Sequence, residues 1–329
     1  MTPRSFFQFI WAAGLASLLG ALAPGAYAQK AYPTKPIKLV VPFAVGGVTD
    51  TSARLIADQL SRRLGQQVVV ENKPGASGNI GTHQVMLSEP DGYTLLMGFD
   101  GTLAINPSVF DKLPFDPVQD FAPIGKIGDA ALILVASPEF PGKTLADVVS
   151  LSKSKPGGLS YGTSGNGGTP HIAGEIFKQR TGANLVHIPY KGGGQAIADA
   201  LGNNVPLVYT AIAGALPHVK SGKLQAIAVS SASRAKSLPN VPTFAESGYP
   251  NFEINSWVGL LVPKKTPSAI VERLNAELNT VLNDAEVKEK LEVLGIAATP
   301  GTPSKFGDEI RRDIARYRAV VKSAGIKLE

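Results

Sequence analysis

The chain has 329 residues, of which 44% are hydrophobic and 18% charged, and it contains no cysteine. Its length suits two lobes, and the lack of cysteine excludes disulfides, thiolate catalysis, cysteine-ligated zinc and iron–sulfur clusters. The net charge is +6, but the basic residues are dispersed, which argues against a nucleic-acid partner.

The first 28 residues have the organisation of a secretory signal peptide. Arg4 precedes an apolar run, and small residues stand at Ala26 and Ala28. This pattern predicts export through the Sec pathway and cleavage before Gln29. The alternative is a membrane anchor, but glycines and a proline interrupt the run before it reaches the roughly 20 apolar residues that span a bilayer. Because no cysteine is available to carry a lipid, we expect the exported protein to stay in the periplasm. We also expect it to be a monomer.

From residue 37 onward, apolar strands alternate with amphipathic helices. The first series has strands at 37–43, 67–72 and 94–99, with a helix ending at Gly65 between the first two. Residues 105–123 are rich in Pro and Asp, and this composition predicts a connector.

A second series of strands and helices follows the connector. It comprises strands at 131–137, 159–164, 185–190, 205–212 and 224–231, with helices starting near 145, 170 and 195. A further strand is expected at 257–263, and a largely helical run follows from 267 to the end.

This order predicts an α/β protein with two lobes, each a mainly parallel sheet flanked by helices. The apolar face of the final helical run is expected to pack on the first lobe, so the chain should cross between lobes twice. The expected lobes are residues 29–128 plus 257–329, and residues 129–256. The arrangement is that of a type II-like periplasmic-binding-protein fold, whose ligand lies beyond the carboxyl ends of the strands, between the lobes.

The loop after the first strand has features of an anion site. Gly46 and Gly47 separate strand from helix, and Thr49 or Asp50 is placed to cap the helix. A helix N-terminus presents unpaired N–H groups, and glycine lets an oxygen approach the backbone closely. The alternative is an ordinary turn that ends in a cap.

A second loop of the same design lies in the other lobe. After the strand at 159–164 come Ser164, Asn166, Gly167 and Gly168, with Thr169 as the expected N-cap and Pro170 as the first helical residue. The alternative for this loop is a flexible glycine turn. Two loops of one design, one in each lobe, would face each other across a single cleft.

The residues of these loops favour a carboxylate over a phosphate. The P-loop pattern fails because Ser137 stands where its first glycine belongs, and the dinucleotide fingerprint fails because Pro170 and Ile197 replace its last glycine. Neither loop contains Lys or Arg. Neutral amides and hydroxyls can hold a carboxylate, whereas phosphate usually recruits a cation.

Catalysis receives little support, so no catalytic residue, metal or other cofactor is predicted. Ser164 with His171 or His187 could make a secreted hydrolase, but Asn166 replaces the closing glycine of a nucleophile elbow. His171 could contact ligand or only pack, and the histidines lack metal spacing. Asp50 and Asp100 could be an acid–base pair.

Asp100 and Tyr209 each follow or close a predicted strand, so we considered both for the site. Asp100 comes after the strand at 94–99 and should point toward the mouth of the cleft, where it could accept hydrogen bonds from an ammonium group or only meet water. Tyr209 could give the cleft a hydroxyl or a ring wall, with core packing as the alternative.

Taken together, these stretches resemble the substrate-binding proteins of tripartite tricarboxylate transporters, the Bug family. The resemblance covers essentially the whole chain after the leader and is carried by an ordered set of motifs. They include "KLVVPFAVGGVTD", "VVENKPGASGNIGT", "DGYTLLMG", "YGTSGNGGTPHIAGEIFK", "HIPYKGGGQAIADALG", "LPNVPTFAESGYPNFE" and "WVGLLVPKKTP".

The resemblance implies a periplasmic receptor that closes on a small carboxylate and presents it to the membrane subunits of a transporter. A sensor that reports to a membrane kinase is an alternative output with the same binding chemistry. The family's two gripping loops correspond here to residues 43–50 and 164–171. The implied ligand residues are Phe43, Ala44, Gly46, Gly47, Thr49, Asp50, Ser164, Asn166, Gly167, Gly168, Thr169 and His171.

The part of the ligand that varies among family members is expected to meet Asp100, Thr102 and Tyr209. Asp100 stands where many relatives are expected to have Ser or Thr. An aspartate there would favour an amino acid, or another ligand that carries a hydrogen-bond donor, over a purely anionic di- or tricarboxylate.

Overall fold

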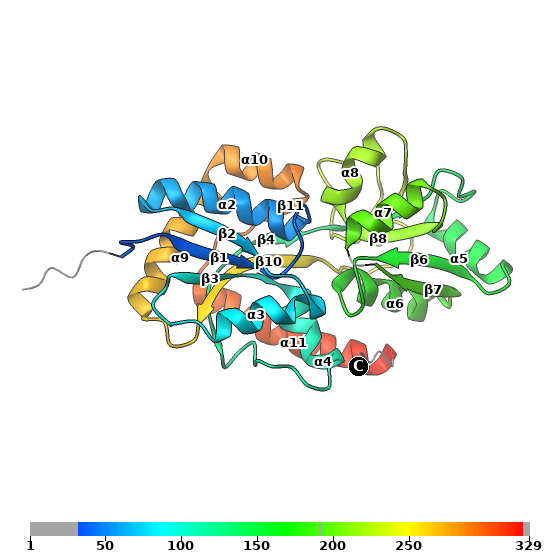
Figure 1. The fold of residues 1–329 in the computed structure, drawn as a ribbon. Coiled ribbons are helices and arrows are strands. Elements are labelled where there is room, and N and C mark those ends of the chain that lie inside the picture. The colour runs from blue at the N-terminus through cyan, green and yellow to red at the C-terminus, as the bar shows by residue number, and fades with distance from the viewer. Residues whose placement is uncertain (1–31, 191, 325–329) are drawn as a thin grey trace, which may run out of the picture. The chain divides into compact units, whose positions relative to one another are not determined.

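The computed structural model describes residues 32–190 and 192–324, so the predicted signal peptide at 1–28 lies outside it. Internal contacts group the described residues from Lys35 onward into one compact unit. This unit contains two β-sheets, each flanked by helices (Figure 1).

The first sheet has six strands. They lie in the order β11 (Ile296–Ala298), β4 (Phe121–Ala130), β10 (Ser256–Pro263), β3 (Thr94–Phe99), β1 (Ile37–Val41) and β2 (Val68–Asn72). β1 pairs in parallel with β2 and β3, whereas β10 runs antiparallel to β3 and β4, and β11 runs antiparallel to β4.

The second sheet has five strands. Their order is β7 (Leu185–Pro189), β6 (Leu159–Thr163), β8 (Leu207–Ala211), β5 (Leu132–Ala136) and β9 (Gln225–Val229). β6 is parallel to β7 and β8, and β5 is antiparallel to β8 and β9.

The chain passes between the sheets twice, as predicted. It leaves the first sheet at the end of β4 and enters the second at β5, with Ala131 alone between them, and it returns from β9 to β10 through residues 230–255. The prediction of mainly parallel sheets needs correction, because both sheets are mixed. β10, which follows the return crossing from the second sheet, runs antiparallel to both of its neighbours, β3 and β4. The predicted lobe boundaries stay a prediction.

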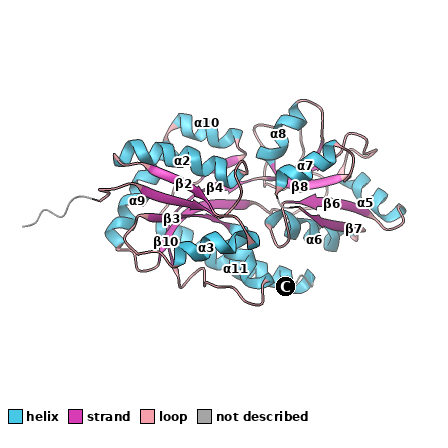
Figure 2. Cartoon of the chain, viewed as in Figure 1, coloured by secondary structure: helices cyan, strands magenta, loops and turns pink. Residues whose placement is uncertain are grey.

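Helices cover the first sheet, as Figure 2 shows. They are α2 (Val48–Leu64), α3 (Asn79–Met86), α4 (Asn106–Val109), α9 (Ser268–Asn283), α10 (Ala285–Val293) and α11 (Pro303–Ala324), with a 3-10 turn η1 (Ala76–Gly78) and a π-helical turn η2 (Gly101–Ile105). α11 buries Phe306, Ile310 and Tyr317 in one cluster with Trp257 and Leu261. This apolar stripe fixes α11 on the sheet, as the final helical run was expected to be.

The second sheet is buried on both faces. Its helices are α5 (Leu145–Ser154), α6 (Thr169–Thr181), α7 (Gly193–Leu201) and α8 (Ile212–Lys220). Along β5, Leu132 and Leu134 belong to one core cluster, whereas Ile133 and Val135 belong to another. This alternation is the period of a strand, so each face of the sheet has its own helical cover.

Seven elements are not among those predicted from the sequence: β4, β11, α3, α4, α8 and the short turns η1 and η2. β4 includes part of the expected connector, and its sequence FAPIGKIGDA carries two glycines and a proline. Hydrogen bonds to β10 on one side and to β11 on the other hold it extended. Within residues 32–190 and 192–324, no helix has both the length and the hydropathy that a bilayer-spanning segment requires.

Candidate ligand-binding site

The loop between β1 and α2 leaves the start of its helix without a side-chain cap. α2 begins at Val48, and its N-cap is Gly47, with φ −75° and ψ 168°. The expectation that Thr49 or Asp50 caps the helix is therefore wrong, since both lie inside its first turn. Because Gly47 has no side chain, the first N–H groups of α2 have no local acceptor.

Asp50 stabilises this loop from within. It is 1% exposed, and its Oδ2 accepts hydrogen bonds from the N–H of Gly46 at 2.9 Å and from Arg54 Nε at 3.1 Å. Its Oδ1 accepts from Asn72 Nδ2 at 2.9 Å. Burial raises the pKa of Asp50, but the hydrogen bonds from Arg54, Gly46 and Asn72 outweigh burial and lower it. Asp50 is thus an ionised support of the loop, with its oxygens already engaged by protein donors.

The loop between β6 and α6 repeats the same device. α6 begins at Thr169, and its N-cap is Gly168, again extended at φ −73° and ψ 162° and with no side-chain cap. Thr169 was expected to be the N-cap, but it is the first helical residue and is fully buried. The Thr169 hydroxyl makes no cap hydrogen bond and donates instead to Asp100 Oδ2 at 2.6 Å.

Two stacked histidines hold this second loop in place. The rings of His171 and His187 lie 3.8 Å apart between centroids, at 12°. His171 Nδ1 accepts the N–H of Gly167 at 3.1 Å, and His187 Nε2 lies 2.7 Å from Thr163 Oγ1. Burial lowers the pKa of His171 to about 4 and that of His187 to about 3. Both rings are therefore neutral at pH 7, as acceptance of the Gly167 N–H requires.

A third segment, Ala76–Gly78, belongs to the site and was missed among the predicted residues. Ala76 and Ser77 are non-glycine residues with positive φ, 46° and 53°, an uncommon conformation that often marks functional sites. The carbonyl of Ser77 accepts from Thr102 Oγ1 at 2.9 Å and from Asn106 Nδ2 at 3.1 Å. The Ser77 hydroxyl donates to the carbonyl of Asn166 at 3.4 Å, which joins the two halves of the site.

The sequence contained a signal for this third segment. "PGASGN" places two glycines around Ala-Ser between β2 and α3, and it lies in one of the motifs that carry the family resemblance. Phe43 from the first loop packs edge-on against Phe99, with ring centroids 5.2 Å apart. A Cβ on Gly78 would contact the Phe43 ring and collide with Thr102. The first loop, η1 and the glycine loop of α6 are therefore linked by contact.

Asp100 does not point toward an open cleft, and this expectation is corrected. Its side chain is fully buried at the end of β3. Oδ2 accepts from Thr169 Oγ1 and from the Tyr317 hydroxyl at 3.4 Å, and Oδ1 accepts from Ser256 Oγ. Burial raises the pKa of Asp100 to about 7, the hydroxyls of Ser256 and Thr169 oppose that rise, and the charge of Asp313 adds to it. Asp100 therefore joins the first sheet to the start of α6.

The other two residues nominated for the variable part of the ligand are also buried. Thr102 is 1% exposed and supports Ser77. Tyr209 is 1% exposed and stacks on Phe244 in the core of the second sheet, with ring centroids 5.8 Å apart. Of the two readings of Tyr209, the structure therefore favours core packing.

The predicted residues thus fall into two groups. Thr49, Asp50, Asp100, Thr102, Thr169, His171 and Tyr209 are buried, whereas Phe43, Ala44, Gly46, Gly47, Ser164, Asn166 and Gly168 are partly or fully exposed. Gly167 is buried and gives its N–H to His171. The exposed group offers backbone N–H groups, a serine hydroxyl and an amide, all neutral donors suited to a carboxylate.

The described residues give no support to the chemistry of a hydrolase or a metal site. Across residues 32–190 and 192–324, no hydrogen bond connects the Ser164 hydroxyl with the ring of His171 or His187. The ring nitrogens that were candidates for a base instead contact Gly167 and Thr163. No group of three or more His, Cys, Asp and Glu side chains with metal-binding geometry occurs in the same part of the chain.

Comparison with known proteins assigns the chain to a family. The family described as "Tripartite tricarboxylate transporter family receptor" matches residues 52–326. The chain belongs to this family. BugT of Bordetella pertussis is 36% identical to it over 322 residues, which are 98% of this chain and 96% of BugT. The predicted resemblance to the Bug family is confirmed, and the chain is a solute-binding receptor of that family.

Solved structures of similar proteins support the fold assignment. A protein of R. palustris solved with adipate is 35% identical, with a TM-score of 0.87 over 90% of this chain and 99% of that chain. MatC from Rhodopseudomonas palustris, solved with bound malate, is 31% identical, with a TM-score of 0.82 over 88% of this chain and 100% of that chain. The periplasmic binding protein BugD is 34% identical, with a TM-score of 0.84 over 91% of this chain and 100% of that chain. The predicted two-lobed periplasmic-binding-protein fold is confirmed.

Proposed function

We propose that this receptor works in the periplasm, closes around a small di- or tricarboxylate and delivers it to the membrane subunits of a tripartite transporter. One observation carries the proposal: the N-cap residue of both α2 and α6 is a glycine, and neither helix has a side-chain cap. Their first N–H groups are thus open to an external anion, from one helix of each sheet.

Contacts between the halves support a closing mechanism. Ser77 donates to the carbonyl of Asn166, and Thr169 donates to Asp100. Each bond joins an element of the first sheet to the loop or helix that follows β6. A carboxylate bound between the two helix starts would add further bonds across the same junction, so it would favour the form in which the halves are in contact.

The structure alters the preferred ligand class. The sequence favoured an amino acid as ligand, because Asp100 could accept hydrogen bonds from its ammonium group. Both oxygens of Asp100 already accept hydroxyl hydrogen bonds in a fully buried position. The solved relatives hold adipate and malate, both dicarboxylates. We therefore favour a compact dicarboxylate or tricarboxylate over an amino acid.

Gly168 offers a sharp test of the carboxylate site. Its backbone is extended, and a Cβ there would meet nothing closer than Pro170 Cδ at 3.7 Å, so larger residues fit. Gly168→Asp should stabilise α6, because aspartate is a favoured N-cap, while its carboxylate occupies the N–H groups meant for ligand. Gly168→Asn is the matched control, with the same size and no charge.

The measurement is calorimetric titration of each protein with succinate, adipate, malate and citrate. Two like charges about 5 Å apart at an effective dielectric of about 20 repel by roughly 3 kcal/mol. Gly168→Asp should therefore bind the wild type's best acid at least about tenfold more weakly than Gly168→Asn does. Equal affinity in both variants would place the carboxylate elsewhere. Ligand-dependent copurification with the transporter's membrane subunits tests delivery.

A further inference from the structure

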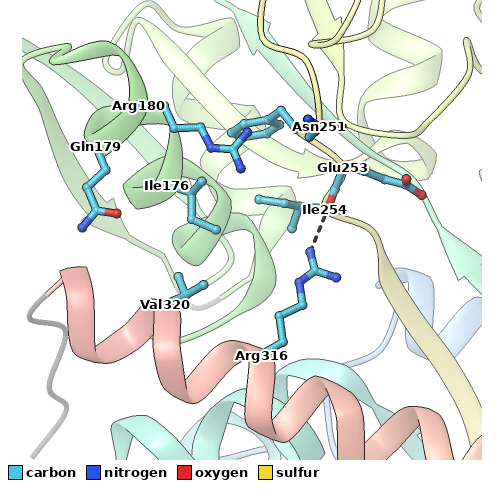
Figure 3. Close-up of a pocket in the computed structure, with 9 residues that line it drawn as sticks. Ile176, Gln179, Arg180, Asn251, Glu253, Ile254, Arg316 and Val320 are labelled. Atoms are coloured by element: carbon cyan, nitrogen blue, oxygen red, sulfur yellow. Dashed lines mark hydrogen bonds between the residues drawn. The ribbon is translucent and has the colours of Figure 1, made fainter.

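A pocket lies at the junction of the two halves, on a part of α6 remote from its N-terminus. Its volume is about 370 Å³, and three segments line it: the second half of α6, residues 251–254 of the return crossing, and α11 (Figure 3). Ile176 and Arg180 lie seven and eleven residues after Thr169 on α6. At about 1.5 Å per residue, the pocket is roughly 10–17 Å along the helix from the carboxylate site.

Two arginines give this pocket an unbalanced positive charge. Arg180 Nη1 donates to the carbonyl of Pro250 at 3.4 Å, and Arg316 Nη2 donates to the carbonyl of Glu253 at 2.9 Å. Both acceptors are neutral, and each guanidinium has five N–H donors. Among the ion pairs of residues 32–190 and 192–324, none includes Arg180 or Arg316. Both cations therefore keep free donors.

The acidic residues nearby do not neutralise the pocket. The carboxylate of Glu253 is directed away from both guanidinium groups in Figure 3, and it accepts from Asn255 Nδ2 at 3.4 Å. Asp313, one turn before Arg316 on α11, accepts from Trp257 Nε1 at 2.7 Å. The charge of Arg316 lowers the pKa of Asp313, against a larger rise from burial. Asp313 thus attracts Arg316 without a direct ion pair.

The rest of the lining is partly apolar: Gln179, Asn251 and Glu253 are polar, whereas Ile176, Phe252, Ile254 and Val320 are hydrophobic. Ile176, Ile254 and Val320 present side chains between the two arginines in Figure 3. The guanidinium of Arg180 lies over the ring of Phe252, 5.5 Å from its centroid, a contact that restricts its motion. A ligand here would meet two cations and a hydrocarbon wall at once.

We propose that this pocket is a second ligand site, which binds a small organic acid with one carboxylate and an apolar body, such as an aromatic acid. The carboxylate accepts hydrogen bonds from Arg180 and Arg316, and the apolar body lies against Ile176, Ile254 and Val320. This ligand differs in class from that of the first site, where neutral donors face a compact polar acid. It would also join α6 to α11, because its arginines come from both helices.

The first experiment locates the ligand. Crystals of the protein are soaked in 4-bromobenzoate, and data are collected at the bromine absorption edge. An anomalous peak between Arg180 and Arg316, with the carboxylate toward the guanidinium groups, is the expected result. A peak confined to the loops at 43–50 and 164–171, or no peak at all, would overturn the proposal.

The second experiment tests the arginines in solution. Binding of 4-fluorobenzoate is followed by the width of its ¹⁹F resonance for wild type and for the double variant Arg180→Gln/Arg316→Gln. The double variant should bind at least tenfold more weakly. Arg234→Gln is the matched control, since Arg234 is an exposed arginine paired with Glu246 at 2.9 Å, and it should bind as wild type does. Equal binding by the double variant and the wild type would refute the site.

Discussion

Asp100→Asn should change the pH dependence of stability in a way that no surface carboxyl can. Asp100 is fully buried and receives hydroxyl hydrogen bonds from Thr169, Ser256 and Tyr317. Burial raises its pKa from an ordinary 3.8 to about 7. Asparagine keeps the size and one carbonyl acceptor of the protonated acid, but it cannot ionise.

The sign and the size follow from proton linkage. Between pH 4 and pH 7 the folded protein keeps a proton on Asp100 that the unfolded chain releases. The contribution of Asp100 to the free energy of unfolding therefore has its full value below the pKa that Asp100 has in the unfolded chain. This contribution is lost as the pH rises to about 7, the pKa in the folded protein. Each pH unit inside that window is worth about 1.4 kcal/mol. From pH 5 to pH 8, the wild type should lose about 3 kcal/mol through Asp100.

The assay is urea unfolding at pH 5, 6, 7 and 8, followed by far-UV circular dichroism. The quantity compared is the stability of Asp100→Asn minus that of the wild type, which should rise by about 3 kcal/mol from pH 5 to pH 8. His171 and His187 also affect acid stability, but they are present in both proteins, so their contributions cancel. Asp58→Asn is the control, because Asp58 is an exposed carboxyl paired with Arg62.

A difference that stays constant from pH 5 to pH 8, within about 0.5 kcal/mol, would refute this reasoning. It would mean that Asp100 is already ionised at pH 5 in the folded protein. The three hydroxyl donors would then outweigh burial, and the junction would hold a buried charge.

Three further predictions concern the support of the site. His171→Ala should lower the free energy of unfolding by about 1–3 kcal/mol at pH 7, because the buried N–H of Gly167 loses its acceptor. Burial lowers the pKa of His171 to about 4, so the stability of the wild type falls as the pH drops from 6.5 toward 4. Unfolding measured at pH 7 and at pH 5 should show a smaller fall in the variant. Gly78→Ala should weaken carboxylate binding and destabilise more than Gly222→Ala, which also has positive φ but meets no neighbour; equal losses in a thermal melt would contradict the predicted clash. Tyr209→Phe should leave carboxylate affinity within about twofold, and a tenfold loss in calorimetry would return Tyr209 to the site.

Much of the site could be predicted because its main signal is local. A glycine pair between a strand and a helix can be recognised within ten residues, and so can the lack of Lys and Arg in both loops. Those two facts predict that an anion can approach the backbone closely at each helix N-terminus and that neutral donors hold it. The alternation of strands and helices likewise predicted two sheets, because a strand's apolar pattern does not depend on its neighbours.

The exact helix starts could not be predicted in the same way. Thr169 is a good N-cap by composition, but it lies inside the first turn of α6, and its hydroxyl donates to Asp100, 69 residues earlier in the chain. The N-cap is Gly168, which has no side chain that could accept from the first N–H groups of the helix. The partner of the Thr169 hydroxyl is a tertiary contact, which local propensity could not show.

Local sequence patterns predicted the alternation of strands and helices, the glycine-rich loop between strand and helix in each half, and the neutral character of both loops. The tertiary structure decided that Asp100, Thr102 and Tyr209 are buried and that β4 is a strand despite its glycines and proline. The physical reason is the distance along the chain over which each property is set. Backbone freedom and apolar periodicity are properties of neighbouring residues, whereas burial and hydrogen-bond partners depend on segments as distant as Asp100 and Ser256, which are 156 residues apart.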